Sequence, residues 1–128
     1  MVSKISHGVR TSVETFYQHS YSNPVDGNFV FAYRITIENQ NTFSIKLLHR
    51  HWRIFDSIGF YKEVDGEGVV GVTPVINPNK KYQYVSSCQL NSEMGCMSGA
   101  YEMENLYTKE LFKVIIPTFE LIAPLKMN

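Results

Sequence analysis

The sequence predicts an all-β fold, an antiparallel immunoglobulin-like β-sandwich of about seven to nine strands. Short segments of alternating apolar and polar residues recur along the chain, and turn-forming residues separate them. No long stretch has helical periodicity, so the crossover helices that join the strands of a parallel sheet are missing. The length of 128 residues suits a single domain of this class, residues 1–128.

Alternation is clearest in the first half of the chain, where β-branched and aromatic residues occupy every second position. The strands predicted there are residues 9–17, 29–39, 43–58 and 60–64. The third of them is long, which suggests a bulge where its inner face changes. It carries Trp52, the only tryptophan, which we expect to fill the core.

The second half repeats the pattern less regularly. The strands predicted there are residues 82–90, 100–107, 111–117 and 118–123. Residues 91–99 are rich in small side chains and predict a loop, and Pro74 and Pro78 exclude a helix before residue 80.

Composition limits the classes of function. Lys+Arg and Asp+Glu are 12 each, so the chain lacks the basic excess that is typical of nucleic-acid-binding proteins. The two cysteines, Cys88 and Cys96, match no zinc spacing or disulfide framework and indicate reduced thiols. The first residues resemble no signal peptide, and no apolar run is long enough for a membrane helix. We therefore expect a cytoplasmic protein that neither binds nucleic acid nor inserts into membranes.

Residues 66–71 spell G-x-G-x-x-G, the pattern of a dinucleotide-binding turn. That function requires a helix directly after the glycines, and the prolines at 74 and 78 prevent one. The glycines are better explained by turns, a bulge or close packing of two chain segments. Gly66, Gly68 and Gly71 remain candidates for a loop that binds a ligand, such as an anion held by backbone amides.

His49 and His51 would share one face of a strand and are candidates for metal ligands. Carboxylates follow at residues 56–67, but no third ligand has a diagnostic spacing, and two polar residues on a solvent-facing strand explain the pair as well. The chain has no nucleophile motif and no metalloprotease motif, and nothing near Cys96 indicates an activated thiol. We expect no catalytic residue and no cofactor.

Several long segments, in order along nearly the whole chain, resemble the ApaG (CorD) family. They are residues 31–39, 47–54, 63–71 with Pro74, 95–101, and 112–119 with Pro124. The resemblance implies a sandwich like that of fibronectin type III domains and no established catalytic residues. It also implies a link with cobalt resistance and magnesium efflux in bacteria. The family more often has a small residue where His49 stands, which weakens the case for a shared metal pair.

Two functions follow as expectations. The first is a non-enzymatic protein-interaction module with a protein partner of unknown identity. The alternative is a sensor of a divalent metal or a phosphoryl ligand in cation homeostasis, using either the histidine pair or the glycine loop. A homodimer is possible through the edge strands of the sandwich.

Overall fold

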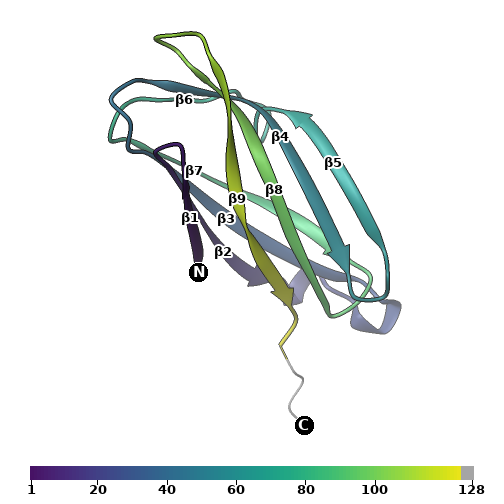
Figure 1. Ribbon diagram of the computed structural model, residues 1–128. Coiled ribbons are helices and arrows are strands. Elements are labelled where there is room, and N and C mark those ends of the chain that lie inside the picture. Colours follow the sequence, from purple (N-terminus) through teal and green to yellow (C-terminus); the bar gives the residue numbers. More distant parts are fainter. Residues whose placement is uncertain (125–128) are drawn as a thin grey trace.

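The structure, a computed structural model, describes residues 1–124. The described residues form nine strands and two short 3₁₀ turns, His19–Tyr21 and Pro24–Asp26 (Figure 1). The strands are β1 (Val2–Ser6), β2 (Val9–Tyr17), β3 (Phe29–Asn39), β4 (Ile45–Asp56), β5 (Tyr61–Glu67), β6 (Val75–Ile76), β7 (Lys81–Leu90), β8 (Met94–Asn105) and β9 (Leu111–Ile122). No helix in this part of the chain has the length and apolar character needed to span a bilayer.

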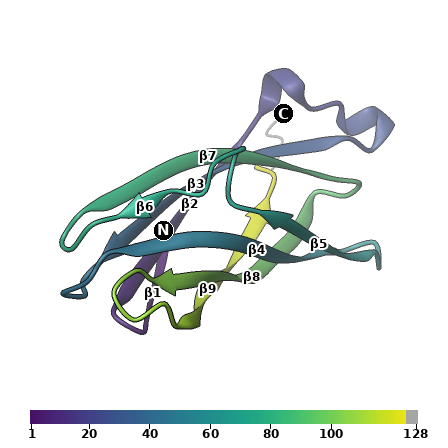
Figure 2. The same ribbon diagram turned by 90° about the horizontal axis from the view of Figure 1, so that it is seen from above.

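The strands form two antiparallel sheets that pack face to face (Figure 2). One sheet has the order β1-β2-β3-β7, and the other has the order β5-β4-β8-β9, with β6 added at one end of β4. Every pairing is antiparallel, and no crossover helix is present among the described residues. The predicted all-β sandwich is confirmed.

One hydrophobic core fills the space between the sheets. Trp52 lies near its centre with 3% of its surface exposed, as predicted. The indole packs edge-to-face on Tyr33 and Phe119, at 5.5 and 5.8 Å between ring centroids. Such aromatic contacts add to the free energy gained by burying the rings.

The predicted bulge in β4 is also present. The register between β4 and β8 shifts between Leu47 and His49. Because of this shift, both Leu47 and Trp52 point into the core although they are an odd number of residues apart. The strand β1 was not predicted because its residues are almost all exposed, and the two-residue β6 is too short for a periodic signal.

Two predictions for the second half were wrong. Residues 94–99 belong to β8 rather than to a loop, and β9 runs through Pro117 as one strand. Position 99 of β8 requires glycine, because a Cβ there would overlap the carbonyl oxygen of His51 and lie 3.1 Å from the indole of Trp52. Pro117 is tolerated because the β8–β9 register shifts beside it, so its missing N–H leaves no gap in the ladder.

The two long edges of the sandwich differ. On one side β1 and β2 lie against β9, and the backbone N–H of Ile115 donates to Ser6 Oγ at 3.2 Å. On the other side β7 and β5 form the edges of their sheets and do not pair with each other. There the chain that follows β5 rises from its own sheet toward β7 (Figure 2). The sandwich is thus closed along one edge and open along the other.

Candidate binding groove

A groove of about 710 Å³ lies at the open edge, a size within the usual range for ligand sites. Residues of β3, β4 and β7, the turn after β5, and Gln18 and Tyr21 after β2 form its walls. Its buried and half-buried lining residues include Tyr33, Arg50, Trp52, Val69, Tyr84 and Ser86. The tyrosine and tryptophan rings make the groove partly apolar, and Arg50 is the one charged residue that lines it within the described chain.

The glycine stretch shapes this groove. Gly66 lies opposite Arg50 in the β4–β5 ladder, and a Cβ at residue 66 would lie 2.6 Å from the guanidinium carbon of Arg50. Gly68 has φ +61°, and a Cβ there would overlap the carbonyl oxygen of Val72. These two glycines therefore make room for a side chain and for a backbone turn. Gly66 belongs to β5 rather than to a loop. A ligand-binding role for Gly66, Gly68 and Gly71 stays a prediction.

Residues 69–72 form a tight turn at the rim of the groove. Val69 N donates to Val72 O at 2.8 Å, and Val72 N donates to Val69 O at 3.1 Å. Val70 and Gly71 both have positive φ, +47° and +79°, as a type I′ turn requires. Val69 is fully buried in the core and anchors the turn. Val70 is a β-branched residue in a conformation that such residues rarely adopt.

Replacing Val70 with asparagine should raise the free energy of unfolding by about 1 kcal/mol, because asparagine tolerates the left-handed region and Asn-Gly favours the type I′ turn. Chemical denaturation measures the gain. Val72→Asn is the matched control, since Val72 is similarly exposed but has no positive φ. An equal gain in both variants would show that backbone strain is not the cause.

Arg50 was not predicted as a site residue. Its Nη1 donates to the carbonyl oxygens of Glu67 and Gly68, at 3.0 and 2.9 Å, and so ties β4 to the glycine loop. Its charge acts to lower the pKa of the nearby Tyr33 and Tyr84, but burial outweighs this effect and raises the pKa of both hydroxyls. The sequence did contain a signal for this role, because Arg50 is a charged residue two positions before Trp52 and therefore lies on the same, inward face of the strand.

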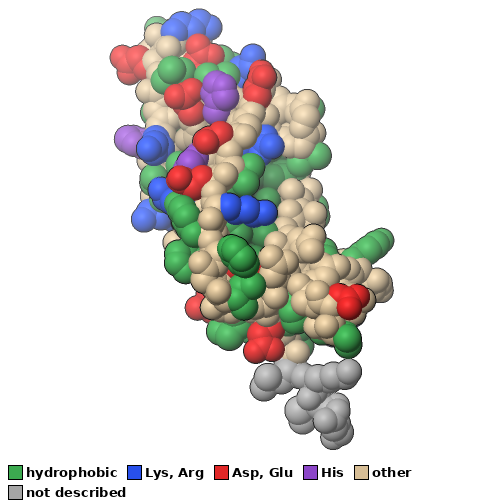
Figure 3. All heavy atoms as spheres, turned by 90° about the vertical axis from the view of Figure 1, so that its right-hand side faces the viewer, with side chains coloured by type: hydrophobic (Ala, Val, Ile, Leu, Met, Phe, Trp, Pro, Cys, Tyr) green, Lys and Arg blue, Asp and Glu red, His purple; other side chains and the backbone are tan. Residues whose placement is uncertain are grey.

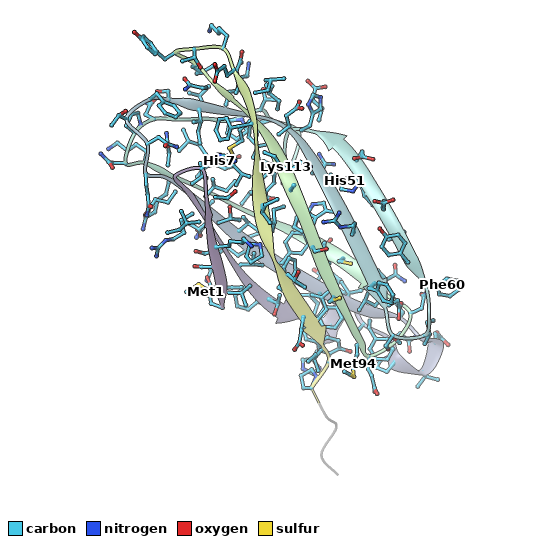
Figure 4. The ribbon with its side chains drawn as sticks, in the orientation of Figure 1. Met1, His7, His51, Phe60, Met94 and Lys113 are labelled. Carbon is cyan, nitrogen blue, oxygen red and sulfur yellow. The ribbon has the colours of Figure 1, made fainter. Side chains whose placement is uncertain are left out.

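His49 and His51 also belong to β4, but they lie on the outer face of the sheet β5-β4-β8-β9, away from the groove. Nδ1 of His49 lies 3.0 Å from Glu102, and the two ring nitrogens of His51 face Asp65 at 2.5 Å and Glu63 at 3.0 Å. Figure 4 shows His51 on β4, next to β5. Acidic and histidine side chains gather in the upper half of the face in Figure 3. Among residues 1–124, no group of three or more His, Cys, Asp and Glu side chains has the arrangement to hold a metal ion.

The pKa of His51 is raised above its usual value of 6.5, first by the hydrogen bond to Asp65 and further by Glu63. Asp65→Asn should lower that pKa, which an NMR titration of the imidazole C–H signals measures.

A group with a raised folded-state pKa stabilises the fold fully below its unfolded pKa and loses that effect as the pH rises through the folded value. The stability difference between wild type and Asp65→Asn should therefore shrink above pH 6.5. An unchanged His51 pKa in the variant would contradict the pairing.

Neither cysteine is bonded to the other. Cys88 is buried in β7, and burial raises the pKa of its thiol to about 11. A thiol with such a pKa carries little thiolate near neutral pH, so Cys88 is a poor nucleophile.

Comparison with known proteins places this arrangement in a family. The model of the ApaG domain matches residues 19–105, which include every groove residue except Gln18, the glycine stretch and both histidines. The chain belongs to the ApaG family. The predicted resemblance is confirmed, and ApaG membership points to no catalytic family.

Named ApaG relatives match over nearly the whole chain. Protein ApaG of Brucella anthropi is 40% identical over 124 residues, which are 97% of this chain and 95% of that protein. Protein ApaG of Paramagnetospirillum magneticum is 41% identical with the same coverage. The crystal structure of an ApaA protein from Bordetella pertussis aligns with a TM-score of 0.88 at 33% identity, covering 92% of this chain and 95% of that one. The sandwich is thus the fold of solved relatives.

Proposed function

We propose that this ApaG protein is a non-enzymatic docking module that accepts an extended segment of a partner protein along the free edge of β7. The observation that carries the proposal is the edge of β7, a ten-residue strand beside the groove, with which no other strand of residues 1–124 pairs on that side. In such β-augmentation the added segment gains main-chain hydrogen bonds, and pockets for alternate side chains give specificity.

The hydrogen-bond register identifies which groups of β7 are free. Asn39 N donates to Lys80 O at 3.0 Å at the end of the β3–β7 ladder. Because hydrogen-bonded pairs alternate along an antiparallel ladder, Tyr84 and every second residue from it bond to β3. The residues between them direct N–H and C=O away from β3, and they include Gln83, Val85 and Ser87. Within residues 1–124, no backbone hydrogen bond reaches these three from the open side.

The groove provides the pocket for side chains that β-augmentation also requires. A strand added beside β7 alternates its side chains between the two faces of the sheet. Those on the inner face point to the same side as Tyr84 and Ser86, which line the groove. A free edge and a partly apolar groove therefore lie where a bound segment would need both.

Val85→Pro tests the docking mode. Proline removes the N–H of Val85, which points to the free edge, and spares the hydrogen bonds to β3. We expect random peptides displayed on phage and selected on the wild-type protein to lose binding to this variant. Backbone amide signals of Gln83, Val85 and Ser87 should shift in NMR spectra when a selected peptide is added to the wild type.

Val85→Ala is the matched control, because it keeps the N–H and removes only the exposed side chain. It should bind the selected peptides as the wild type does. Peptides that bind Val85→Pro and wild type equally would refute docking at β7, as would a selection that enriches no peptide.

A sensor of divalent cations or phosphoryl groups, with the link to cobalt and magnesium, is the other candidate. It has less support, because carboxylates engage His49 and His51, and within residues 1–124 no group of three such side chains has the arrangement to hold a metal ion. Calorimetric titration with Co²⁺ and Mg²⁺ tests it, with His51→Ala as the variant. Saturable binding that is lost in His51→Ala would favour this role over docking.

A further inference from the structure

Arg50 carries a positive charge that no carboxylate of the described residues neutralises. The ion pairs of residues 1–124 involve Arg34, Lys81 and the two histidines of β4, but not Arg50. Arg50 is half-buried and lines the groove, and its hydrogen bonds run only from Nη1 to two backbone carbonyls. A guanidinium has five N–H donors, so those on Nε and Nη2 have no partner in this part of the chain.

The guanidinium is also fixed in place. The carbonyl oxygens of Glu67 and Gly68 hold Nη1, and Gly66 leaves the space that the planar group occupies. An arginine that is ordered before binding loses less conformational freedom when a ligand arrives. A free Nε–Nη2 edge is one of the geometries that binds both oxygens of a carboxylate.

The charges around the open edge favour an acidic occupant. No Asp or Glu lines the groove, and Lys62 lines a second groove of about 230 Å³ farther along the same edge. Asp56 also lines that second groove, but it is buried and accepts a hydrogen bond from Asn91 N at 2.6 Å. The acidic residues of β5 stand opposite the outward-facing residues of β4, on the other face of the sheet. They are Glu63, Asp65 and Glu67.

We propose that the segment accepted along β7 is acidic, and that one of its Asp or Glu side chains forms a two-pronged ion pair with Arg50. The inference rests on the proposed function, because the β7 edge brings the segment past Arg50. The inner-face side chains of an added strand point toward Tyr84, Ser86 and the guanidinium. An acidic side chain there gains charge-assisted hydrogen bonds in a partly desolvated site.

The test uses a synthetic peptide from the phage selection and its analogue with the acid replaced by the amide, Asp to Asn or Glu to Gln. On the wild-type protein the analogue should bind about ten-fold more weakly, as expected for loss of a charged hydrogen-bond pair. On Arg50→Gln the peptide and the analogue should bind equally. Lys62→Gln is the matched control, since it removes one positive charge from the same edge but leaves Arg50 in place. It should retain the ten-fold difference.

Several results separate failure of this inference from failure of the docking function. If selected peptides bind at β7 but carry no acid, or if the amide analogue binds as tightly, the acidic inference is overturned and docking stands. If no peptide binds, both are overturned. If light scattering shows a dimer that Val85→Pro dissociates, a second copy occupies the edge, and the acidic inference is again overturned. Arg50→Lys is the control for misfolding of Arg50→Gln. It keeps the positive charge and should retain part of the preference for the acidic peptide.

Discussion

Trp52→Ala is expected to lower the free energy of unfolding by about 3–5 kcal/mol, the usual cost of removing a large buried aromatic side chain. The loss combines the burial of the indole, its edge-to-face contacts with Tyr33 and Phe119, and the cavity left behind. Both sheets contribute to these contacts, so relaxation of one strand cannot fill the space. Urea unfolding followed by circular dichroism measures the change, because the variant lacks the tryptophan that fluorescence would report.

Trp52→Phe provides the comparison for this prediction. It keeps an aromatic ring between the sheets and leaves a smaller cavity, so its cost should be clearly lower than that of alanine. A loss of less than about 1 kcal/mol in Trp52→Ala, as is typical of surface substitutions, would mean that the indole is not part of the core.

Gly68→Ala is expected to cost about 2–4 kcal/mol, from a left-handed backbone and an overlap with a neighbouring chain segment. The new Cβ would overlap the carbonyl oxygen of Val72, so the turn at 69–72 must move. That movement would also displace Val69 from the core. Chemical denaturation gives the loss of stability.

Gly71→Ala separates the two causes. Gly71 has φ +79°, but a Cβ at this position would meet nothing within 4 Å. Its substitution should therefore cost only about 1 kcal/mol, the strain of the left-handed conformation alone. Equal losses in the two variants would show that the overlap at Gly68 is relieved without cost.

Strands whose alternation is regular could be predicted from the sequence with correct bounds. β2 and β3 were predicted at their full extents because each has one buried and one more exposed face, and that contrast is the periodic signal itself. β1 lacks the contrast, since nearly all its residues are exposed and only its pairing with β2 makes it a strand. Pairing between distant segments leaves no local pattern to detect.

Small residues misled the prediction for β8. Glycine, serine and cysteine between residues 95 and 99 are typical of loops, yet Gly95 and Gly99 lie in a central strand where neighbouring backbones and side chains leave no room for a Cβ. The reason for those glycines lies in β4, about forty residues away in the chain. Composition alone cannot separate a glycine chosen for flexibility from one chosen for lack of volume.

The site residues show the same limit. The glycine stretch could be assigned to a backbone role because Pro74 excluded the helix that a nucleotide site requires. The groove could not be predicted, since it depends on β7 and β5 lying at free edges on the same side of the sandwich. Arg50 could not be predicted as a site residue for the same reason, because only that arrangement places it in one groove with Tyr84 of the opposite sheet.

The difference between the two long edges has a mechanical consequence. Along one edge the contacts of β1 and β2 with β9 hold the two sheets together. Along the other edge β7 and β5 do not pair, and the turn anchored by Val69 lies between the sheets. A small rotation about the closed edge would therefore change the width of the groove most and the packing around β1 and β9 least. We expect the groove to adapt to side chains of different size without loss of a strand pairing.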